Sequence, residues 1–348
     1  MARHHQPRWK IALQADIPSI QTWSIRCGLQ LLAHRNEIEL RHMARELPAG
    51  PGVWLEVTDR TTSDNRSIHI DIGDRADPAS KRMQAADTSW ARCPVPGSGR
   101  PLGLLAPMRT RGQNGTRYLS NAAWAAVRNR RFRHLWAVQH SLRTFRPPLI
   151  DSLELDAGGD AKVLYQVTAW NPAESADSAG REWLNDRRAA LVVALREAFG
   201  DRFVGGFVPT EHALHRYPEL VTNFPSGRLE YLDLIRQCRV VVSGVGLHGS
   251  NPWKLAEYLA ASRAIVAEPL QSEIPESLDP VVHWFEQPEQ CVGICERLLS
   301  DQTATAEHQR KAGEYWRRYV RPDQLLMNRL QEEFASTPFR HLHDGKQE

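Results

Sequence analysis

The second half of the chain alternates short apolar runs with longer amphipathic segments, and this alternation limits the possible fold more than any other feature. The apolar runs are rich in Val and Ile and lack the polar alternation of a half-exposed strand, as in RVVVSGV at 239–245. Strands of this kind separated by helices predict a parallel sheet that is covered on both faces. The expected strands are 162–170, 202–208, 239–245, 264–269 and 280–285, with helices at 185–200, 231–238, from Pro252 onward, 291–301 and 304–336.

The first half shows the same pattern more weakly. Its strand candidates are 9–16, 52–59 and 67–74, with a helical segment around 21–34. A chain of 348 residues is long enough for two domains, each with its own core. We expect an N-terminal Rossmann-like domain over residues 1–150, a C-terminal domain over 151–325, and a helix end and tail over 326–348.

Three glycines follow the strand at 239–245 in the spacing G-x-G-x-x-G, namely Gly244, Gly246 and Gly249. Glu268 lies at the end of the next strand, 24 residues after Gly244. A strand, this glycine spacing and a later acidic residue match the dinucleotide-binding fingerprint. An NAD(P)-dependent oxidoreductase is therefore one interpretation of the sequence.

The start of the following helix favours a different ligand. Ser250 and Asn251 are good N-caps and Pro252 suits a first turn, so the helix begins after all three glycines rather than inside them. The free N–H groups at such a start attract phosphate. Lys254 would lie beside this phosphate, and Glu257, on the same side of the helix, accepts two sugar hydroxyls. The same spacing also fits an ordinary surface Lys–Glu pair.

The stretch YLDLIRQCRVVVSGVGLHGSNPWKLAEYLAASRAIVAEPL at 231–270 resembles the C-terminal domain of group-1 glycosyltransferases of the GT-B fold. KLAEYLAASRAIV at 254–266 fits the family pattern K-L-x-E-Y-x-A-x-x-x-x-I-V closely, and the similarity covers about residues 160–300. The resemblance implies two Rossmann-like α/β domains with parallel sheets that face a cleft. It also implies that the nucleotide sugar binds to the C-terminal domain and the acceptor to the N-terminal domain.

By this resemblance, Glu257 binds the nucleotide ribose, and five residues line the donor diphosphate and sugar: Gly246, Leu247, His248, Gly249 and Ser250. Two departures from the family pattern stand out. Gly249 occupies the position of the first glutamate of the E-x7-E pair that retaining members carry. The basic pair after the first C-terminal strand is also not evident, and Arg181, Arg187 or Lys254 would have to supply its charge.

Other polar residues follow strands that should end at the cleft. Asp71 and Asp74 are candidates for a general base that acts on an acceptor hydroxyl, although a carboxylate that bonds its own loop fits the same pattern. Asp59 has the same standing. His248 is a candidate catalytic residue or a stabiliser of the turn. Trp170 either stacks on the sugar or base of the donor or packs in the core.

Charge is distributed unevenly along the chain. Residues 88–150 contain eleven arginines and no Asp or Glu. A basic helix is expected at 119–145, and three interpretations of it stay open: it lies on an anionic membrane, it binds nucleic acid, or its apolar stripe packs in the core while the arginines are solvated. We expect nucleic acid to be the least suitable of these partners.

The sequence lacks an apolar N-terminal segment and an apolar run long enough for a membrane span. We therefore expect a cytoplasmic protein that is peripheral on the inner face of the membrane if the basic helix binds lipid. Five cysteines without a CxxC pair predict neither a disulfide framework nor a zinc site.

Together these features predict a metal-independent GT-B glycosyltransferase that transfers a sugar from a nucleoside-diphosphate sugar to a hydroxyl, in the synthesis of cell-surface glycans or glycoconjugates. No cofactor is expected beyond this co-substrate, and no Asp-x-Asp motif is present for a metal-bound diphosphate. The expected acceptor is a glycan or a lipid-linked sugar. Two alternatives stay open: a transferase-like protein that binds the nucleotide sugar without turnover, and the oxidoreductase.

Overall fold

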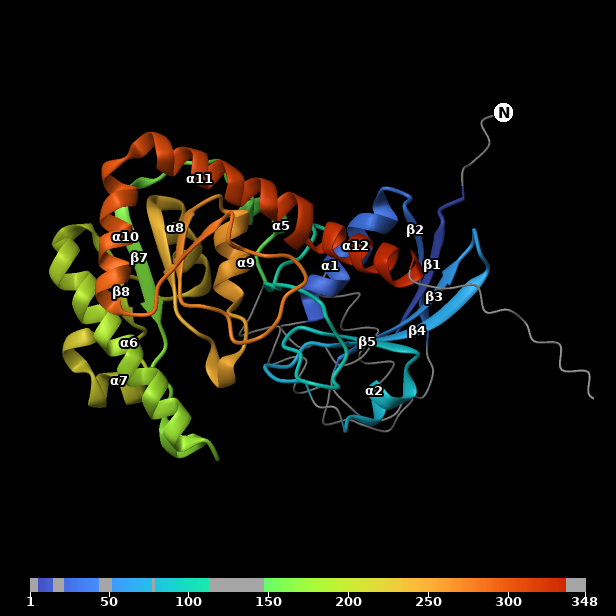
Figure 1. Cartoon of the computed structure of the whole chain (residues 1–348), viewed down its shortest axis with the longest axis horizontal. Helices are drawn as coiled ribbons and strands as arrows, with labels where there is room; N and C mark the ends of the chain where they lie inside the picture. The colour runs from blue at the N-terminus through green and yellow to red at the C-terminus, as the bar shows by residue number, and fades with distance from the viewer. Residues whose placement is uncertain (1–5, 15–21, 44–51, 77–78, 113–146, 336–348) are drawn as a thin grey trace, which may run out of the picture.

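The computed structural model describes residues 6–14, 22–43, 52–76, 79–112 and 147–335 as two α/β units side by side, each built on one sheet (Figure 1). The C-terminal sheet has the order β11-β10-β9-β7-β8, and every pair of neighbours is parallel. This confirms the prediction made from the alternating apolar runs. Its strands are β7 (Asp160–Val167), β8 (Phe203–Phe207), β9 (Cys238–Ser243), β10 (Ala264–Ala267) and β11 (Val282–Trp284).

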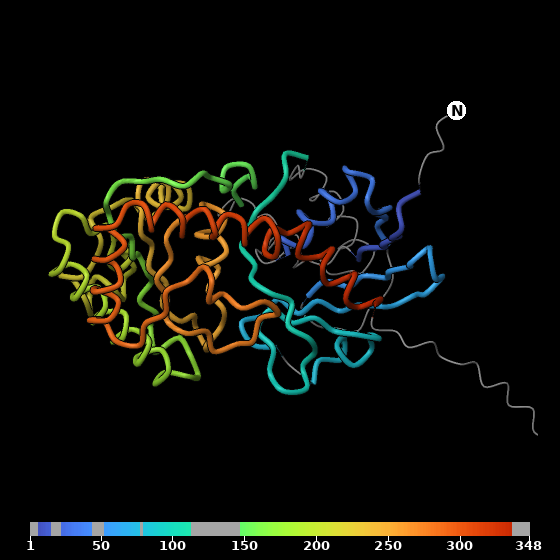
Figure 2. Tube along the Cα trace, turned by 45° about the horizontal axis from the view of Figure 1, so that its top comes forward, coloured from blue at the N-terminus to red at the C-terminus, as the bar shows by residue number. Residues whose placement is uncertain are grey.

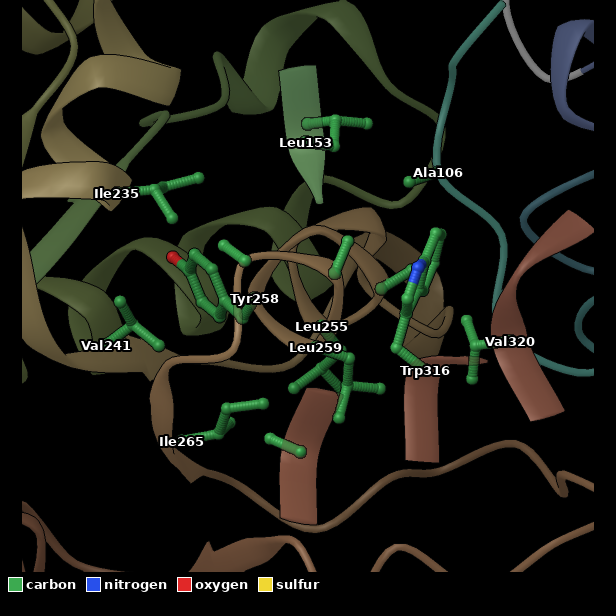
Figure 3. Packing of buried hydrophobic residues seen from close by; sticks show 14 of the residues in the cluster. Ala106, Leu153, Ile235, Val241, Leu255, Tyr258, Leu259, Ile265, Trp316 and Val320 are labelled. Carbon is green, nitrogen blue, oxygen red and sulfur yellow. The ribbon is translucent and has the colours of Figure 1, made fainter. Parts of the chain in front are cut away.

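Helices cover both faces of the C-terminal sheet. Because successive residues of each strand point to opposite sides, each strand contributes to a core cluster on either face. Val240 and Val242 of β9 belong to a core cluster with α6 and α10, whereas Val241 belongs to a cluster with α8 and α9. Figure 3 shows the second cluster, in which Trp316 lies beside Val320. The helices are α6 (Ser178–Phe199), α7 (Glu211–Arg216), α8 (Arg228–Gln237), α9 (Trp253–Ala260), α10 (Pro288–Ser300) and α11 (Gln302–Tyr315).

The N-terminal sheet has the order β2-β1-β3-β4-β5-β6 and is mixed rather than wholly parallel. Strand β3 runs antiparallel to both of its neighbours, β1 and β4. Only residues 60–63 join β3 to β4, and a connection this short makes a hairpin, since parallel strands need a long crossover. The elements are β1 (Trp9–Gln14), α1 (Thr22–His34), β2 (Ile38–Met43), β3 (Val53–Asp59), β4 (Asp64–Asp71), α2 (Lys81–Ala85), β5 (Thr88–Ala91), β6 (Arg100–Pro101) and α5 (Ile150–Leu153).

The chain returns to the N-terminal unit at its end. A π-helical turn at Trp316–Val320 follows α11, and α12 (Pro322–Ala335) then packs against α1 (Figure 2). Leu325, Leu326, Leu330 and Phe334 of α12 belong to the same core cluster as the strands of the N-terminal sheet. The N-terminal core is therefore completed by residues that follow the whole C-terminal unit in the sequence.

Within the described part of the chain, no helix is both long and apolar enough to cross a lipid bilayer. The basic helix expected at 119–145 lies outside the described residues. All five cysteines are buried and free.

Candidate functional site

The order of strands in the C-terminal sheet marks one place for a ligand. The chain leaves β7 for β8 on one side of it and then crosses to β9 on the other side. In open α/β sheets, ligands bind outside the carboxyl ends of the strands at this point of reversal. The two loops that meet there are residues 168–171, after β7, and residues 244–252, after β9. The second loop contains the three glycines.

This glycine turn has a backbone shape that other residues adopt poorly. It forms a 3-10 turn at Leu247–Gly249, with a φ of 55° at His248 and 74° at Gly249. A side chain at Gly246 would place its Cβ 2.6 Å from the hydroxyl oxygen of Ser250. A glutamate at position 249 would have to adopt the left-handed conformation, which disfavours β-carbon-bearing residues. Glycine therefore suits the backbone at position 249 better than a glutamate would.

Helix α9 begins at Trp253, after all three glycines, as the sequence predicts. Its cap residue is Pro252, however, and no side chain caps its first turn. The predicted caps are thus wrong, because Ser250 lies buried within the turn and Asn251 bonds to the other half of the molecule. The N–H of Leu255 bonds the carbonyl of Pro252, so among the described residues the N–H groups of Trp253 and Lys254 are those left for a ligand or for water.

Glu268 fixes the base of the glycine turn through its side-chain carboxylate. One carboxylate oxygen accepts a hydrogen bond from the backbone N–H of Val245 at 2.8 Å, and the other accepts from Arg187 Nε. Arg187 also donates to the carbonyl of Glu286 at 2.7 Å. Both oxygens of this buried carboxylate are therefore engaged, which leaves it unsuited to the ribose of a dinucleotide. Arg187 in turn has its charge matched by Glu268.

Lys254 points inward rather than along the surface. Its Nζ donates to the carbonyl of Gln166 on β7 and lies 4.7 Å from the ring centroid of Tyr231. Burial, and next the charge of Arg188, lower the pKa of this lysine to about 7. Lys254 and Glu257 do not pair with each other, so the interpretation as a surface Lys–Glu pair is wrong.

Arg188 connects the two loops at the point of reversal, and sequence reasoning missed it. Its two Nη atoms donate to the carbonyl of Thr168 at 2.7 Å and to that of Val245 at 3.1 Å. Burial lowers its pKa. The signal was present in the sequence: Arg188 lies four residues after Leu184 and three before Leu191, on the apolar stripe of α6.

Glu257 is a further buried charged residue near the glycine turn. It is 1% exposed, and one of its oxygens accepts from Nη2 of Arg228 at the start of α8. Its second oxygen, Oε2, has no hydrogen-bond partner among the described residues. A buried carboxylate oxygen without a donor carries a desolvation cost that a ligand hydroxyl would remove.

The remaining C-terminal candidates lie around the mouth of the two loops. His248 is at the exposed tip of the turn, with its Nδ1 3.4 Å from Oδ2 of Asp177. The backbone of Trp170 is fixed by Asn185, through bonds of 2.9 Å and 2.7 Å. Arg181 lies over the Trp170 ring at 5.8 Å from its centroid. The structure thus brings Trp170 and His248 to the same edge of the sheet.

The candidate carboxylates of the N-terminal unit lie in two different places. Asp71 is buried and bonds the N–H of Gly73 at 2.8 Å, so it holds its own loop. Asp74 bonds Nη2 of Arg92 at 3.0 Å. Asp59 is at the opposite edge of the sheet, because β3 runs antiparallel, and its place at the cleft is therefore a wrong prediction. Despite its burial, the bonds from Arg8 and Thr61 lower the pKa of Asp59 to about 2.

No group of three or more His, Cys, Asp and Glu side chains in the described ranges is arranged to hold a metal ion.

Comparisons with known proteins give fold-level similarity at low identity. No family model and no curated protein matches the sequence. Among solved structures, HepE from Anabaena in complex with UDP is 9% identical over 94% of this chain and 98% of its own, with a TM-score of 0.41. A putative UDP-N-acetylglucosamine 2-epimerase from Listeria monocytogenes is 11% identical over 92% and 94%, with a TM-score of 0.38.

The C-terminal domain of a group-1 glycosyl transferase, LpcC, from Francisella tularensis is 14% identical over 52% of this chain and 89% of its own, with a TM-score of 0.30. The proteins found thus include the family that residues 231–270 resemble. At these TM-scores, the functional assignment rests on the contacts of the chain itself.

Proposed function

We propose that this chain is a GT-B glycosyltransferase that takes its sugar from a nucleoside-diphosphate sugar. The observation that carries the proposal is Glu257, buried at the point of reversal of the sheet with one carboxylate oxygen unpartnered. A ribose hydroxyl is the donor that this oxygen lacks. The helix start and glycine turn above it suit the attached diphosphate.

The cations around the turn support the same ligand. Lys254 and Arg188 lie below it, and neither pairs with Glu257. Positive charge that is fixed in a water-poor site stabilises the negative charge that develops on a leaving diphosphate. In this proposal no metal is needed, since the protein supplies that charge itself.

The acceptor side of the proposal concerns Asp74 and the basic segment of the sequence. Asp74 is the candidate general base, since it is partly exposed and bonded to Arg92, which also contacts the C-terminal unit. We propose a glycan or lipid-linked hydroxyl as the acceptor, in cell-surface glycan synthesis, with the arginine-rich segment 119–145 as the part of the sequence that suits an anionic membrane surface. The sequence alone supports this step.

The shape of the glycine turn favours a second candidate function. Gly249, in a left-handed conformation that glutamate adopts poorly, stands where retaining members carry a glutamate. A protein that binds the nucleotide sugar without turning it over fits that observation. Binding without transfer or slow hydrolysis identifies this case.

The first test is a thermal-shift screen with UDP-, GDP-, ADP-, CMP- and dTDP-sugars, and with NAD and NADP as controls. A ligand that binds only the folded protein raises the melting temperature. We expect a shift with one class of nucleotide sugar and none with NAD or NADP. A shift with NAD or NADP alone would contradict the proposal.

Calorimetry with the Glu257→Gln variant then tests the carrying residue. The substitution keeps the shape and the contact with Arg228 but removes the charge, so we expect at least about tenfold weaker binding of the nucleotide sugar, or about 1.4 kcal/mol. Glu314→Gln, at an exposed ion pair on α11, is the matched control and should bind as the wild type does. Unchanged affinity in Glu257→Gln rules out the proposed ribose contact.

A further inference from the structure

Asn251 bonds the C-terminal unit to the N-terminal unit at the edge of the glycine turn. Its backbone N–H donates to the Sγ of Cys93 at 3.3 Å, and its side-chain Nδ2 donates to the carbonyl of Arg92 at 3.3 Å. Its own carbonyl accepts from Nη2 of Arg92 at 3.1 Å. Three hydrogen bonds therefore run between Asn251 and residues 92–93, and we call them the Arg92–Asn251 contact.

The contact joins the two segments that the proposed function needs. Asn251 directly follows the glycine turn and is separated from α9 only by Pro252. Arg92 directly follows β5, and its backbone N–H bonds the carbonyl of Asp71 at 2.9 Å. Its guanidinium also bonds Asp74 at 3.0 Å. Arg92 thus contacts both the loop that carries Asp71 and Asp74 and Asn251, which lies just before α9.

The Arg92–Asn251 contact is deeply buried but incompletely bonded. Arg92, Cys93 and Asn251 are 1%, 1% and 2% exposed. The Nε and Nη1 atoms of Arg92 and the Oδ1 of Asn251 have no hydrogen-bond partner among the described residues. Burying a guanidinium with bonds unmade is costly, and apolar side chains at such places often give equal or greater stability. Stability alone does not account for these residues at this place.

We infer that Asn251 is a positioning residue that holds the glycine turn and the start of α9 against the N-terminal unit. The part of this inference that concerns the nucleotide rests on the proposed function. By linkage, a ligand that binds better when the turn is held must strengthen the Arg92–Asn251 contact by the same factor. The contact therefore couples donor binding to the arrangement of the two units.

The thiol of Cys93 reports the state of the contact directly. A buried thiol reacts with iodoacetamide only when its surroundings open, and the rate follows the population of the open form. Asn251→Ala removes the bond to Arg92, so we expect Cys93 to be labelled about fivefold faster, as suits the loss of one hydrogen bond. Peptide mass spectrometry separates Cys93 from Cys238 and Cys291, which lie in the C-terminal core and should keep their rates.

Glu276→Gln is the matched control. It weakens the ion pair between Glu276 and Arg329 of α12, which lies outside the Arg92–Asn251 contact. We expect this variant to label Cys93 at the wild-type rate. If Asn251→Ala unfolds the protein, all cysteines are labelled together, and Asn251→Ser replaces it. Wild-type labelling of Cys93 in the folded Asn251 variant would overturn the inference.

The nucleotide supplies the second arm. Saturating the wild type with the nucleotide sugar found in the thermal screen should slow labelling of Cys93, and Asn251→Ala should bind that sugar more weakly by a similar factor. The coupling is overturned if the sugar binds the wild type without slowing the labelling of Cys93 and binds Asn251→Ala with the wild-type affinity. If no nucleotide sugar binds the wild type, the proposed function fails together with the coupling, whereas the labelling of the variants still decides whether Asn251 holds the turn.

Discussion

Lys254 carries its charge in a half-buried position, where burial and the nearby cations Arg188 and Arg228 lower its pKa to about 7. Glu257 opposes this shift but does not cancel it. In the free protein near neutral pH, the amine is therefore charged only part of the time. A bound diphosphate would favour the charged form and raise the pKa again.

Binding of the nucleotide sugar should consequently take up a proton. A nucleoside-diphosphate sugar has no proton of its own to lose near neutral pH, so the affinity should fall by about tenfold from about pH 7 to about pH 8.5, as Lys254 loses its charge in the free protein. Calorimetry at both pH values, in buffers of different ionisation enthalpy, measures the affinity and the proton uptake.

Lys254→Met is the control for this prediction, because methionine keeps much of the side-chain volume and does not titrate. Its binding should be weaker and independent of pH over the same range. A slope that persists in the methionine variant would assign the titration to another group.

At the level of residues, the sequence predicts where Lys254 and Glu257 lie but not what they touch. Lys254 bonds a carbonyl 88 positions away, and Glu257 pairs with an arginine 29 positions away. Helical spacing places residues on one face of one helix and says nothing about partners on other elements. Glu268 shows the same limit, since its position fits a ribose acceptor while its oxygens hold Val245 and Arg187.

At the level of elements, the glycine turn depends on Gly246 for space rather than for an unusual φ. A Cβ there would lie 2.6 Å from Ser250 Oγ and 3.0 Å from its carbonyl carbon. Gly246→Ala must therefore shift the backbone of the turn, and we expect a loss of about 1–3 kcal/mol in the free energy of unfolding. Binding of the nucleotide sugar should weaken as well, since the turn N–H groups move.

Gly112→Ala is the comparison for that variant, because among the described residues the nearest side-chain atom would lie 3.9 Å from its Cβ and its φ is not left-handed. Urea denaturation and calorimetry on both variants separate the shape of the turn from the general cost of alanine. Equal stability of the two variants would show that the turn relaxes freely around residue 246.

The elements also show which parts of the fold were predictable. Val- and Ile-rich runs separated by helices specify the parallel C-terminal sheet, because only strands buried on both faces tolerate them. The N-terminal expectation was wrong for β3, although the signal was present: residues 60–63 are too few for a parallel crossover. This one reversal moves Asp59 to the far edge of the sheet, whereas Asp71 and Asp74 both bond Arg92, which contacts the C-terminal unit.

At the scale of the whole molecule, α12 joins the end of the chain to the N-terminal core. The sequence predicts a long final helix with an apolar stripe, but such a stripe packs equally well on either unit, so its destination was not predictable. The structure places α12 against α1, where a Cβ on Gly28 would lie 2.6 Å from the carbonyl carbon of Pro322 and 2.8 Å from Cδ1 of Leu326.

Alanine substitutions at two helical glycines should therefore have opposite effects on the free energy of unfolding. Gly28→Ala has to push the backbone of α12 away, so we expect a loss of about 1–3 kcal/mol in the free energy of unfolding despite the better helix propensity of alanine. In Gly293→Ala, on α10, the new Cβ would be 3.8 Å from the nearest atom, and the lower entropy of the unfolded chain should stabilise the protein by about 0.5–1 kcal/mol. Urea midpoints of the two variants, measured on the whole chain, should lie on opposite sides of the wild type. A stabilising Gly28→Ala would mean that α1 and α12 are not held in contact in solution, and that the N-terminal core does not require the end of the chain.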